Sequence, residues 1–322
     1  MESDRMLEGV RAGGLMPSGT PVLVLLSGGR DSVCLLDLAV RALGPGEVTA
    51  LHVNYGLRED ADQDQRHCRD LCAELQVELE VERPRRPEGP GNLQSWARDT
   101  RYAAAARLAL PGEATIATGH TADDQVETIL YRLASSPSRR ALLGMRPRDG
   151  RLARPLLPFA RAETTAYCQE RGLAWRDDST NAEATYARNR VRHGLIPALA
   201  AVHPAAAANV LRTAELLRDE AEVLDAIVAA EVDGSKGAAR GTIGLERFAA
   251  LAPALRRLVV QRLADSVAGR PVAGAARHAE EVAALRRTGT AMLDLGGGIR
   301  AVVERGVLRV ERRQSADTPI AG

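Results

Sequence analysis

The fold is decided by one stretch near the amino terminus, Val22-Leu23-Val24-Leu25-Leu26-Ser27-Gly28-Gly29-Arg30-Asp31-Ser32. Its first five residues are all apolar, which is typical of a parallel strand covered by helices on both faces. After the loop, Val33, Leu36, Val40 and Leu43 recur at helical spacing. The stretch therefore predicts a strand, a small polar loop and a helix.

The same alternation continues toward the carboxyl terminus. We predict further strands at 48–53, 77–81 and 114–118 and helices at 62–75, from Asn92 to about 108, and from 121. This order indicates a doubly wound, mostly parallel α/β sheet, and we expect a short segment at 173–176 to complete it.

A second, mainly helical region is predicted beyond the sheet. It starts with a long Ala/Leu/Glu-rich helix from Pro204 and closes with two strand-like runs, 299–304 and 307–311, joined by Arg305-Gly306 as a hairpin turn. We therefore expect two domains, 1–203 with the sheet and 204–322 with the helices and the hairpin.

Composition excludes several classes of protein. The 322 residues carry 43 Lys+Arg and 42 Asp+Glu, a net charge of +1, so total charge indicates no polyanionic partner. Lys236 is the only lysine, and its surroundings do not fit a Walker A loop. The arginine excess is explained by a GC-rich genome. Four scattered cysteines predict reduced, buried thiols, and the absence of a long apolar run predicts a cytoplasmic protein without a membrane span.

The loop Ser27-Gly28-Gly29-Arg30-Asp31-Ser32 carries the first chemistry. Two glycines allow backbone N–H groups to approach a ligand, the helix behind them favours an anion, and both serines add donors for phosphate oxygens. An aspartate beside a phosphate implies an intervening cation, so Asp31 predicts bound Mg²⁺. The alternative is an ordinary Gly-Gly turn with Asp31 as a helix cap, but the position after the first strand favours the ligand site.

Ser-Gly-Gly-x-Asp-Ser after the first strand resembles the PP-loop of ATP pyrophosphatases. Further motifs, in order and at the right spacing, are similar to those of tRNA(Ile)-lysidine synthetases. They are His52-Val53-Asn54-Tyr55-Gly56-Leu57-Arg58, Ala97-Arg98-Asp99-Thr100-Arg101-Tyr102, Thr118-Gly119-His120 through Thr128, Arg154-Pro155-Leu156-Leu157, Asp177 to Asn181 and Tyr186 to Arg192. The resemblance implies ATP and Mg²⁺ as cofactors, and free L-lysine and tRNA(Ile) with a CAU anticodon as substrates.

Four of these residues are candidates for catalysis together with the loop. Arg98 and Arg101 share a helix face, and Arg101 is the better match for a residue that stabilises charge on the phosphates. The alternative is that both arginines belong to a solvent-exposed charged face. His120 either contacts the nucleotide or acts as a base. Asp124 fits a helix cap with Thr121 and equally a carboxylate for lysine or its proton.

The helix from 121 is expected to bury Val126, Ile129, Leu130 and Leu133 and to carry Asp124 and Glu127 on its other side. The resemblance implies that this acidic pair binds lysine. Residues 132–192 hold 13 arginines against six acids, a local charge of +7. Arg188 and Arg192 beside Tyr186 are therefore expected to contact tRNA.

The implied reaction is adenylation of the wobble cytidine at C2, followed by attack of the lysine ε-amine, giving lysidine, AMP and pyrophosphate. A tRNA-thiolating PP-loop enzyme is the main alternative, but such enzymes use paired cysteines, and the chain has no C-x-x-C. An amide-forming PP-loop synthetase and a non-catalytic nucleotide-binding module are weaker alternatives, and a homodimer stays open. The chain departs from the family at Tyr55 and Thr121, where second histidines are usual, and at residues 134–138.

Overall fold

The computed structural model describes residues 1–57, 59–85, 93–109, 114–136, 139–176, 187–233 and 241–313. Five features of the sequence discussed above lie outside these ranges: Arg58, the helix cap Asn92, the motif 177–181, Tyr186 and Lys236. The chain packs as two compact units, Met1–Glu215 and Leu216–Gly322. The division falls within the long helix α10 (Ala206–Asp233), and the functional boundary expected at 203 stays a prediction.

The first unit is built on a six-stranded sheet in the order β3-β2-β1-β4-β6-β5, with every neighbouring pair parallel except β5 and β6. Its strands are β1 (Val22–Leu25), β2 (Val48–Val53), β3 (Glu78–Glu82), β4 (Thr115–Ala117), β5 (Arg148–Asp149) and β6 (Leu152–Ala153). The doubly wound sheet predicted from the sequence is confirmed.

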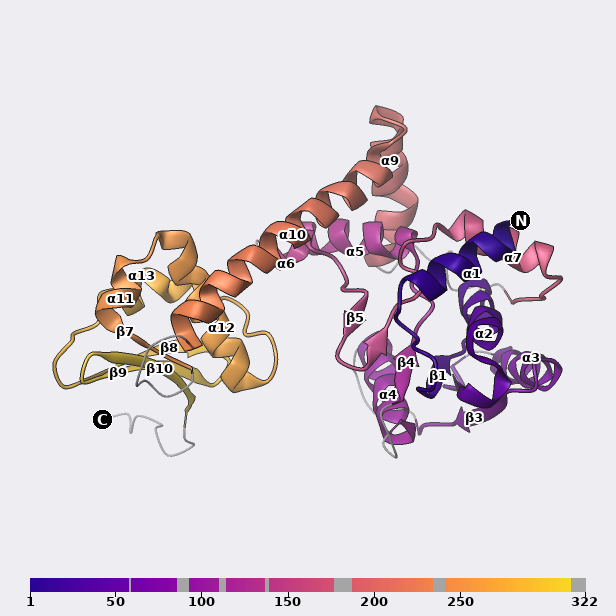
Figure 1. The fold of residues 1–322 in the computed structure, drawn as a ribbon, viewed down its shortest axis with the longest axis horizontal. Coiled ribbons are helices and arrows are strands. Elements are labelled where there is room, and N and C mark those ends of the chain that lie inside the picture. The colour runs from indigo at the N-terminus through magenta and orange to yellow at the C-terminus, as the bar shows by residue number, and fades with distance from the viewer. Residues whose placement is uncertain are drawn as a thin grey trace. The chain divides into compact units, whose positions relative to one another are not determined.

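Helices cover both faces of this sheet (Figure 1). The helices in the cores against the sheet are α1 (Glu2–Ala12), α2 (Arg30–Leu43), α3 (Ala61–Glu74), α4 (Leu93–Leu108) and α7 (Arg161–Glu170). The other helices before α10 are α5 (Ala122–Ser135), α6 (Arg139–Leu142), α8 (Ala187–Arg190) and α9 (Ile196–Val202), and α5 packs against α9 and α10. Alternate residues of β1 enter opposite cores. Val22 and Val24 pack with α1, α2, α3 and α7, whereas Leu23 and Leu25 pack with α4. This division explains why the strand is apolar throughout.

One predicted strand is wrong. The segment 173–176 is not part of the sheet; it runs beside the loop after β1, where the Arg176 N–H donates to the Gly28 carbonyl (3.0 Å). The sheet is completed instead by β6, whose register pairs Ile116 with Leu152 and Ala117 with Ala153. Two residues in an arginine- and proline-rich stretch are too few to produce a recognisable strand pattern.

The second unit holds a four-stranded antiparallel sheet in the order β7-β10-β9-β8, packed with the end of α10 and with three further α-helices. Its elements are β7 (Thr242–Gly244), α11 (Leu245–Ala250), α12 (Pro253–Ala268), α13 (Ala279–Ala283), β8 (Thr290–Gly296), β9 (Ile299–Glu304) and β10 (Val307–Arg312). The predicted hairpin is confirmed, with positive φ at Arg305 and Gly306 as a tight primed turn requires. The sequence did not predict β7 and β8.

No single helix in the described ranges is long and apolar enough to cross a membrane. Only Ala187–Val202 and Ala206–Val232 taken together meet that criterion, and they are bent by 95° relative to each other.

Candidate active site

The loop Ser27–Ser32 lies at the carboxyl end of β1 and leads into α2, whose first residue is Arg30. The Ser32 hydroxyl donates to the Gly29 carbonyl (2.8 Å) and accepts from the Ser27 N–H (3.1 Å). The Gly29 N–H donates to the Ser27 hydroxyl (3.3 Å). Both serine hydroxyls are thus held beside the loop amides, and the Ser32 N–H donates to the Gly29 carbonyl (3.0 Å). The N–H groups of Arg30 and Asp31, at the start of α2, have no intrahelical acceptor. This arrangement suits a phosphate group.

Two glycines permit this geometry. Gly28 has φ +84°, which only glycine adopts readily, and a Cβ there would lie 3.2 Å from the Cys68 sulfur. Gly119, after β4, has ordinary φ, but a Cβ would lie 2.9 Å from the Asp31 carbonyl oxygen and 3.1 Å from the Ser32 nitrogen. The turn after β4 therefore rests directly on the backbone of the loop.

Replacing Gly119 with alanine is expected to lower ATP affinity at least about tenfold and to cost about 1–3 kcal/mol of stability, because backbone must move to admit the methyl group. Calorimetric ATP titration and urea unfolding measure both effects. Gly46→Ala is the matched control, since a Cβ at Gly46 meets no atom within 4 Å. Equal ATP affinity in the two variants would contradict the close contact.

Asp31 is held by its neighbour Arg30 and by two residues of α7. Its Oδ1 accepts hydrogen bonds from the Thr164 hydroxyl (2.6 Å) and from Arg30 Nε (3.2 Å), and its Oδ2 lies 3.7 Å from Arg161 Nε. Within the described ranges no cluster of three or more His, Cys, Asp or Glu side chains could hold a metal. A single carboxylate nevertheless fits Mg²⁺, which commonly binds one or two carboxylates together with substrate phosphates and water.

Asp124 is a helix cap, one of the two roles left open by the sequence, and its role toward lysine stays a prediction. It caps α5, because its Oδ2 accepts from the Thr121 N–H (2.9 Å) and hydroxyl (3.0 Å). Its Oδ1 accepts from Arg161 Nη2 (3.0 Å). Capping accordingly uses one oxygen and leaves the other oxygen to the charged cluster.

Glu127 lies 3% exposed on the same helix. Arg192 donates two hydrogen bonds to its carboxylate (2.6 and 3.1 Å), and Arg161 Nη1 lies 3.7 Å away. The predicted division of α5 into an apolar buried face and a polar side is wrong at both ends, since Glu127 is buried and Leu133 is 55% exposed. Arg192 contacts the buried Glu127, whereas Leu133 lies in the last turn of α5 and is exposed to solvent.

Arg161 is the residue that sequence reasoning missed. Its guanidinium lies within 4 Å of carboxylate oxygens of Asp31, Asp124 and Glu127, and its backbone N–H donates to Asp123 (2.7 Å). The available signal was a basic residue at the start of a helix, where the helix dipole disfavours a cation unless acids lie nearby. Arg192, expected to contact tRNA, lies in this cluster as well, whereas Arg188 is exposed.

His120 lies at the mouth of β4, with Nδ1 2.8 Å from the Thr118 hydroxyl. The pKa of His120 is lowered to about 4, chiefly by burial; Asp124 opposes this shift, and Arg154, Arg101 and Arg98 add to it. His120 is therefore neutral near pH 7 and a weak base in the ligand-free protein, so its role as a catalytic base stays a prediction.

This lowered pKa predicts a pH dependence of stability. Between pH 4 and 6.5 the unfolded chain binds a proton at His120 that the folded protein does not, so stability rises with pH across this window. His120→Gln should remove about 3 kcal/mol of that dependence. Urea unfolding of both proteins at several pH values measures it, and identical pH slopes would contradict the assignment.

Arg98, Arg101 and Tyr102 share one face of α4 as predicted. The guanidinium carbons of Arg98 and Arg101 lie 5.0 and 5.7 Å from the Tyr102 ring centroid. Arg101 Nε is buried and has no hydrogen-bond partner. A positively charged, aromatic face is thus present on α4, and its contact with phosphates stays a prediction.

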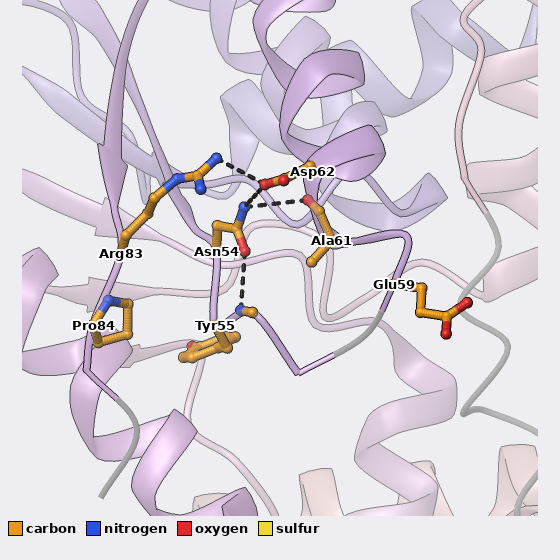
Figure 2. Close-up of a pocket in the computed structure, with 8 residues that line it drawn as sticks. Asn54, Tyr55, Glu59, Ala61, Asp62, Arg83 and Pro84 are labelled. Carbon is orange, nitrogen blue, oxygen red and sulfur yellow. Dashed lines mark hydrogen bonds and ion pairs between the residues drawn. The ribbon is translucent and has the colours of Figure 1, made fainter.

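A pocket of about 320 Å³ opens at the carboxyl ends of β2 and β3, one strand away from the loop (Figure 2). Asn54 organises its floor, donating to Asp62 (3.0 Å) and accepting from the Gly56 N–H (3.0 Å), and Arg83 also donates to Asp62 (2.8 Å). The pocket has polar walls and room for part of a nucleoside.

Comparison with known proteins agrees with this geometry. Residues 11–199, more than half of the chain, match the PP-loop domain family. A tRNA(Ile)-lysidine synthase of Symbiobacterium thermophilum is 36% identical over 334 residues, which cover 96% of this chain and 69% of the relative. The chain belongs to the tRNA(Ile)-lysidine synthase family. A further relative, the tRNA(Ile)-lysidine synthase of Dehalococcoides mccartyi, is 32% identical over 88% of this chain.

The chain is shorter than these family members, spanning 64% of the Dehalococcoides mccartyi protein and 69% of the Symbiobacterium thermophilum protein. Among solved structures, a U34-tRNA thiolase of Methanococcus maripaludis with its [4Fe-4S] cluster matches with a TM-score of 0.55 and 17% identity, covering 67% of this chain and 78% of the thiolase. At that identity the likeness shows the PP-loop fold alone. All four cysteines of this chain are buried, as expected from the sequence.

The departure from the family motif at Tyr55 has a structural counterpart. The Tyr55 hydroxyl donates to the Ala97 carbonyl (2.8 Å), and its ring meets Trp96 edge-on at 5.6 Å. Tyr55 thereby attaches the turn after β2 to α4, the helix that carries Arg101. The tyrosine serves packing here, in a position where the family usually has a histidine.

Proposed function

We propose that this chain is a cytoplasmic tRNA(Ile)-lysidine synthetase, an ATP-dependent ligase that joins lysine to the wobble cytidine of tRNA(Ile) with a CAU anticodon. One observation carries the proposal: Arg161 lies within 4 Å of Asp31, Asp124 and Glu127. The phosphate loop and the acidic pair of α5 therefore belong to a single site. A site that joins a phosphate cradle to paired carboxylates suits ATP together with a cationic amino acid.

In the first step, the loop amides and the hydroxyls of Ser27 and Ser32 hold the ATP phosphates. The wobble cytidine leaves the base stack, because C2 is otherwise inaccessible. Its O2 attacks the α-phosphorus, and the bond to pyrophosphate breaks. In this proposal Arg101 and Arg30 stabilise the charge on the leaving group. Asp31 would hold Mg²⁺, which when bound neutralises phosphate charge.

In the second step, lysine binds through its ammonium groups to Asp124 and Glu127. Both carboxylates are occupied by Arg161 and Arg192 in this structure, so lysine must share or displace those contacts. A carboxylate takes the proton from the ε-ammonium, and the neutral amine attacks C2. AMP leaves with the former O2, and the modified base keeps a carbon–nitrogen bond.

The test is an incorporation assay with purified protein, ATP, Mg²⁺, labelled L-lysine and tRNA(Ile) transcript with a CAU anticodon. We expect label in the tRNA together with AMP and pyrophosphate in equal amounts. A transcript with a UAU anticodon is the matched control and should take no label. ATP consumption that needs tRNA but not lysine, with no label transferred, would overturn the proposal.

A further inference from the structure

The site is divided electrostatically into two parts. The three acids Asp31, Asp124 and Glu127 form ion pairs with Arg30, Arg161 and Arg192. Arg98, Arg101 and Arg154 lie near enough to His120 to act on its charge, and Arg98 and Arg154 act in the same way on Arg132. Within the described ranges, none of these four arginines forms an ion pair. We call these four arginines the unpaired arginine group.

Arg154 is the most deeply placed member of this group. It follows β6 at the carboxyl edge, where the neighbouring Ala153 carbonyl accepts from the Thr118 N–H (3.0 Å) beside His120. Arg154 is only 5% exposed, and its Nε has no hydrogen-bond partner. Burying a guanidinium without an anion is costly. Burial lowers the pKa of the Arg154 guanidinium, and the charges of Tyr102 and Asp149 offset this only in part.

The loop 144–146 holds the side chains of Arg154 and Arg132 through its backbone carbonyls. The Arg154 guanidinium donates to the Arg146 carbonyl (2.6 Å), and Arg132 donates to the Gly144 carbonyl (2.7 Å). The Gln125 side-chain amide accepts from the Met145 N–H (2.7 Å) and donates to the Met145 carbonyl (3.0 Å). The turn needs glycine at 144, where φ is +64° and a Cβ would lie 2.7 Å from the Gln125 amide.

This scaffold connects the arginines to α5 itself. Gln125 lies between Asp124 and Glu127 in sequence and is 1% exposed. The same helix thus presents carboxylates to the paired cluster and, through Gln125 and the 144–146 loop, sets the position of Arg132 and Arg154. Such preorganised cations stabilise an anion without reorganising when it arrives.

We propose that Arg154, supported by Arg132, forms an anion subsite that binds the anionic oxygens of a substrate other than ATP. The inference rests on the proposed function. The two available sources of that chemistry are the α-carboxylate of lysine and a phosphodiester of the tRNA near the reacting base. Arg154 is placed as a binding residue whose planar fork suits either group.

Two binding measurements on the full chain test the subsite. The first is equilibrium dialysis with labelled L-lysine, competed by unlabelled L-lysine or by pentane-1,5-diamine, which lacks the carboxylate. If Arg154 binds the carboxylate, the wild-type protein should prefer lysine over the diamine by about ten- to a hundredfold, and Arg154→Gln should lose that preference. The second is tRNA binding across a salt series. If Arg154 binds a phosphodiester, Arg154→Gln should lower the salt slope by about one.

Arg132→Gln is a second variant at an exposed position, which keeps the test usable if Arg154→Gln fails to fold. Arg151→Gln is the matched control, since Arg151 also donates to a backbone carbonyl (Ala114, 3.1 Å) but at the opposite end of β6. The subsite is overturned if folded Arg154→Gln or Arg132→Gln matches the control in both measurements, or if only ATP affinity changes. Because neither measurement requires turnover, absence of lysine transfer by the wild-type protein would overturn the proposed function alone.

Discussion

Replacing Asp31 with asparagine should lower tRNA-dependent release of pyrophosphate by about a thousandfold. Asp31 is the only acid in the loop Ser27–Ser32, and it lies at the start of α2, where the ATP phosphates are proposed to bind. Asparagine keeps an acceptor for the Thr164 hydroxyl but removes the charge that would hold Mg²⁺. Single-turnover pyrophosphate release measures the effect.

Thr164→Val is the matched variant for Asp31. It removes the hydrogen bond to Asp31 (2.6 Å) while leaving the carboxylate charge in place, so we expect a loss of only about tenfold. Equal losses in the two variants would mean that Asp31 acts through its position and that its charge is unimportant. Full activity of Asp31→Asn would exclude Asp31 from the phosphate site.

Replacing Glu127 with glutamine should lower the efficiency of lysine use by about a hundredfold and leave adenylation near the wild-type rate. Glu127 is 3% exposed and holds Arg192 through two hydrogen bonds of 2.6 and 3.1 Å. The amide keeps the shape of the side chain but cannot neutralise a substrate ammonium. The measurements are lysine incorporation at varied lysine concentrations and, separately, tRNA-dependent release of pyrophosphate.

Glu231→Gln is the control for this change, because Glu231 also accepts two hydrogen bonds from one arginine, Arg247, but in the second unit. It should have wild-type lysine kinetics. If Glu127→Gln loses adenylation and lysine use to the same extent, Glu127 supports the whole site and does not bind lysine. Unchanged lysine dependence would remove the acidic pair from the lysine pocket.

Local patterns explain what could be predicted about the fold. The strand at 48–53 and the hairpin strand at 299–304 coincide with β2 and β9 because each is a contiguous run of strand-forming residues. β6 has no such run, because it consists of only two residues. These two residues form a strand because β4 pairs with them on one side and β5 on the other. Short pairings of this kind become visible only when the rest of the sheet is in place.

The candidate site divides in the same way. The phosphate loop was readable because its donors are contiguous in the chain, and the Asp124 cap because its partner is three residues away. Arg161 could not be assigned to Asp31 from sequence, since the segments that meet there are more than 100 residues apart, as the Thr164 to Asp31 hydrogen bond shows.

The sequence by itself determined the family, the sheet architecture and the loop at which phosphates are expected, all of which depend on near neighbours and ordered motifs. Only the tertiary structure decided which arginines are neutralised. Thirteen arginines between residues 132 and 192 look alike in the sequence, yet Arg161 and Arg192 pair with buried carboxylates while Arg154 is buried without one. The physical reason is that the energy of a charge depends on its burial and on the nearest opposite charge, and both are set by segments that meet only on folding.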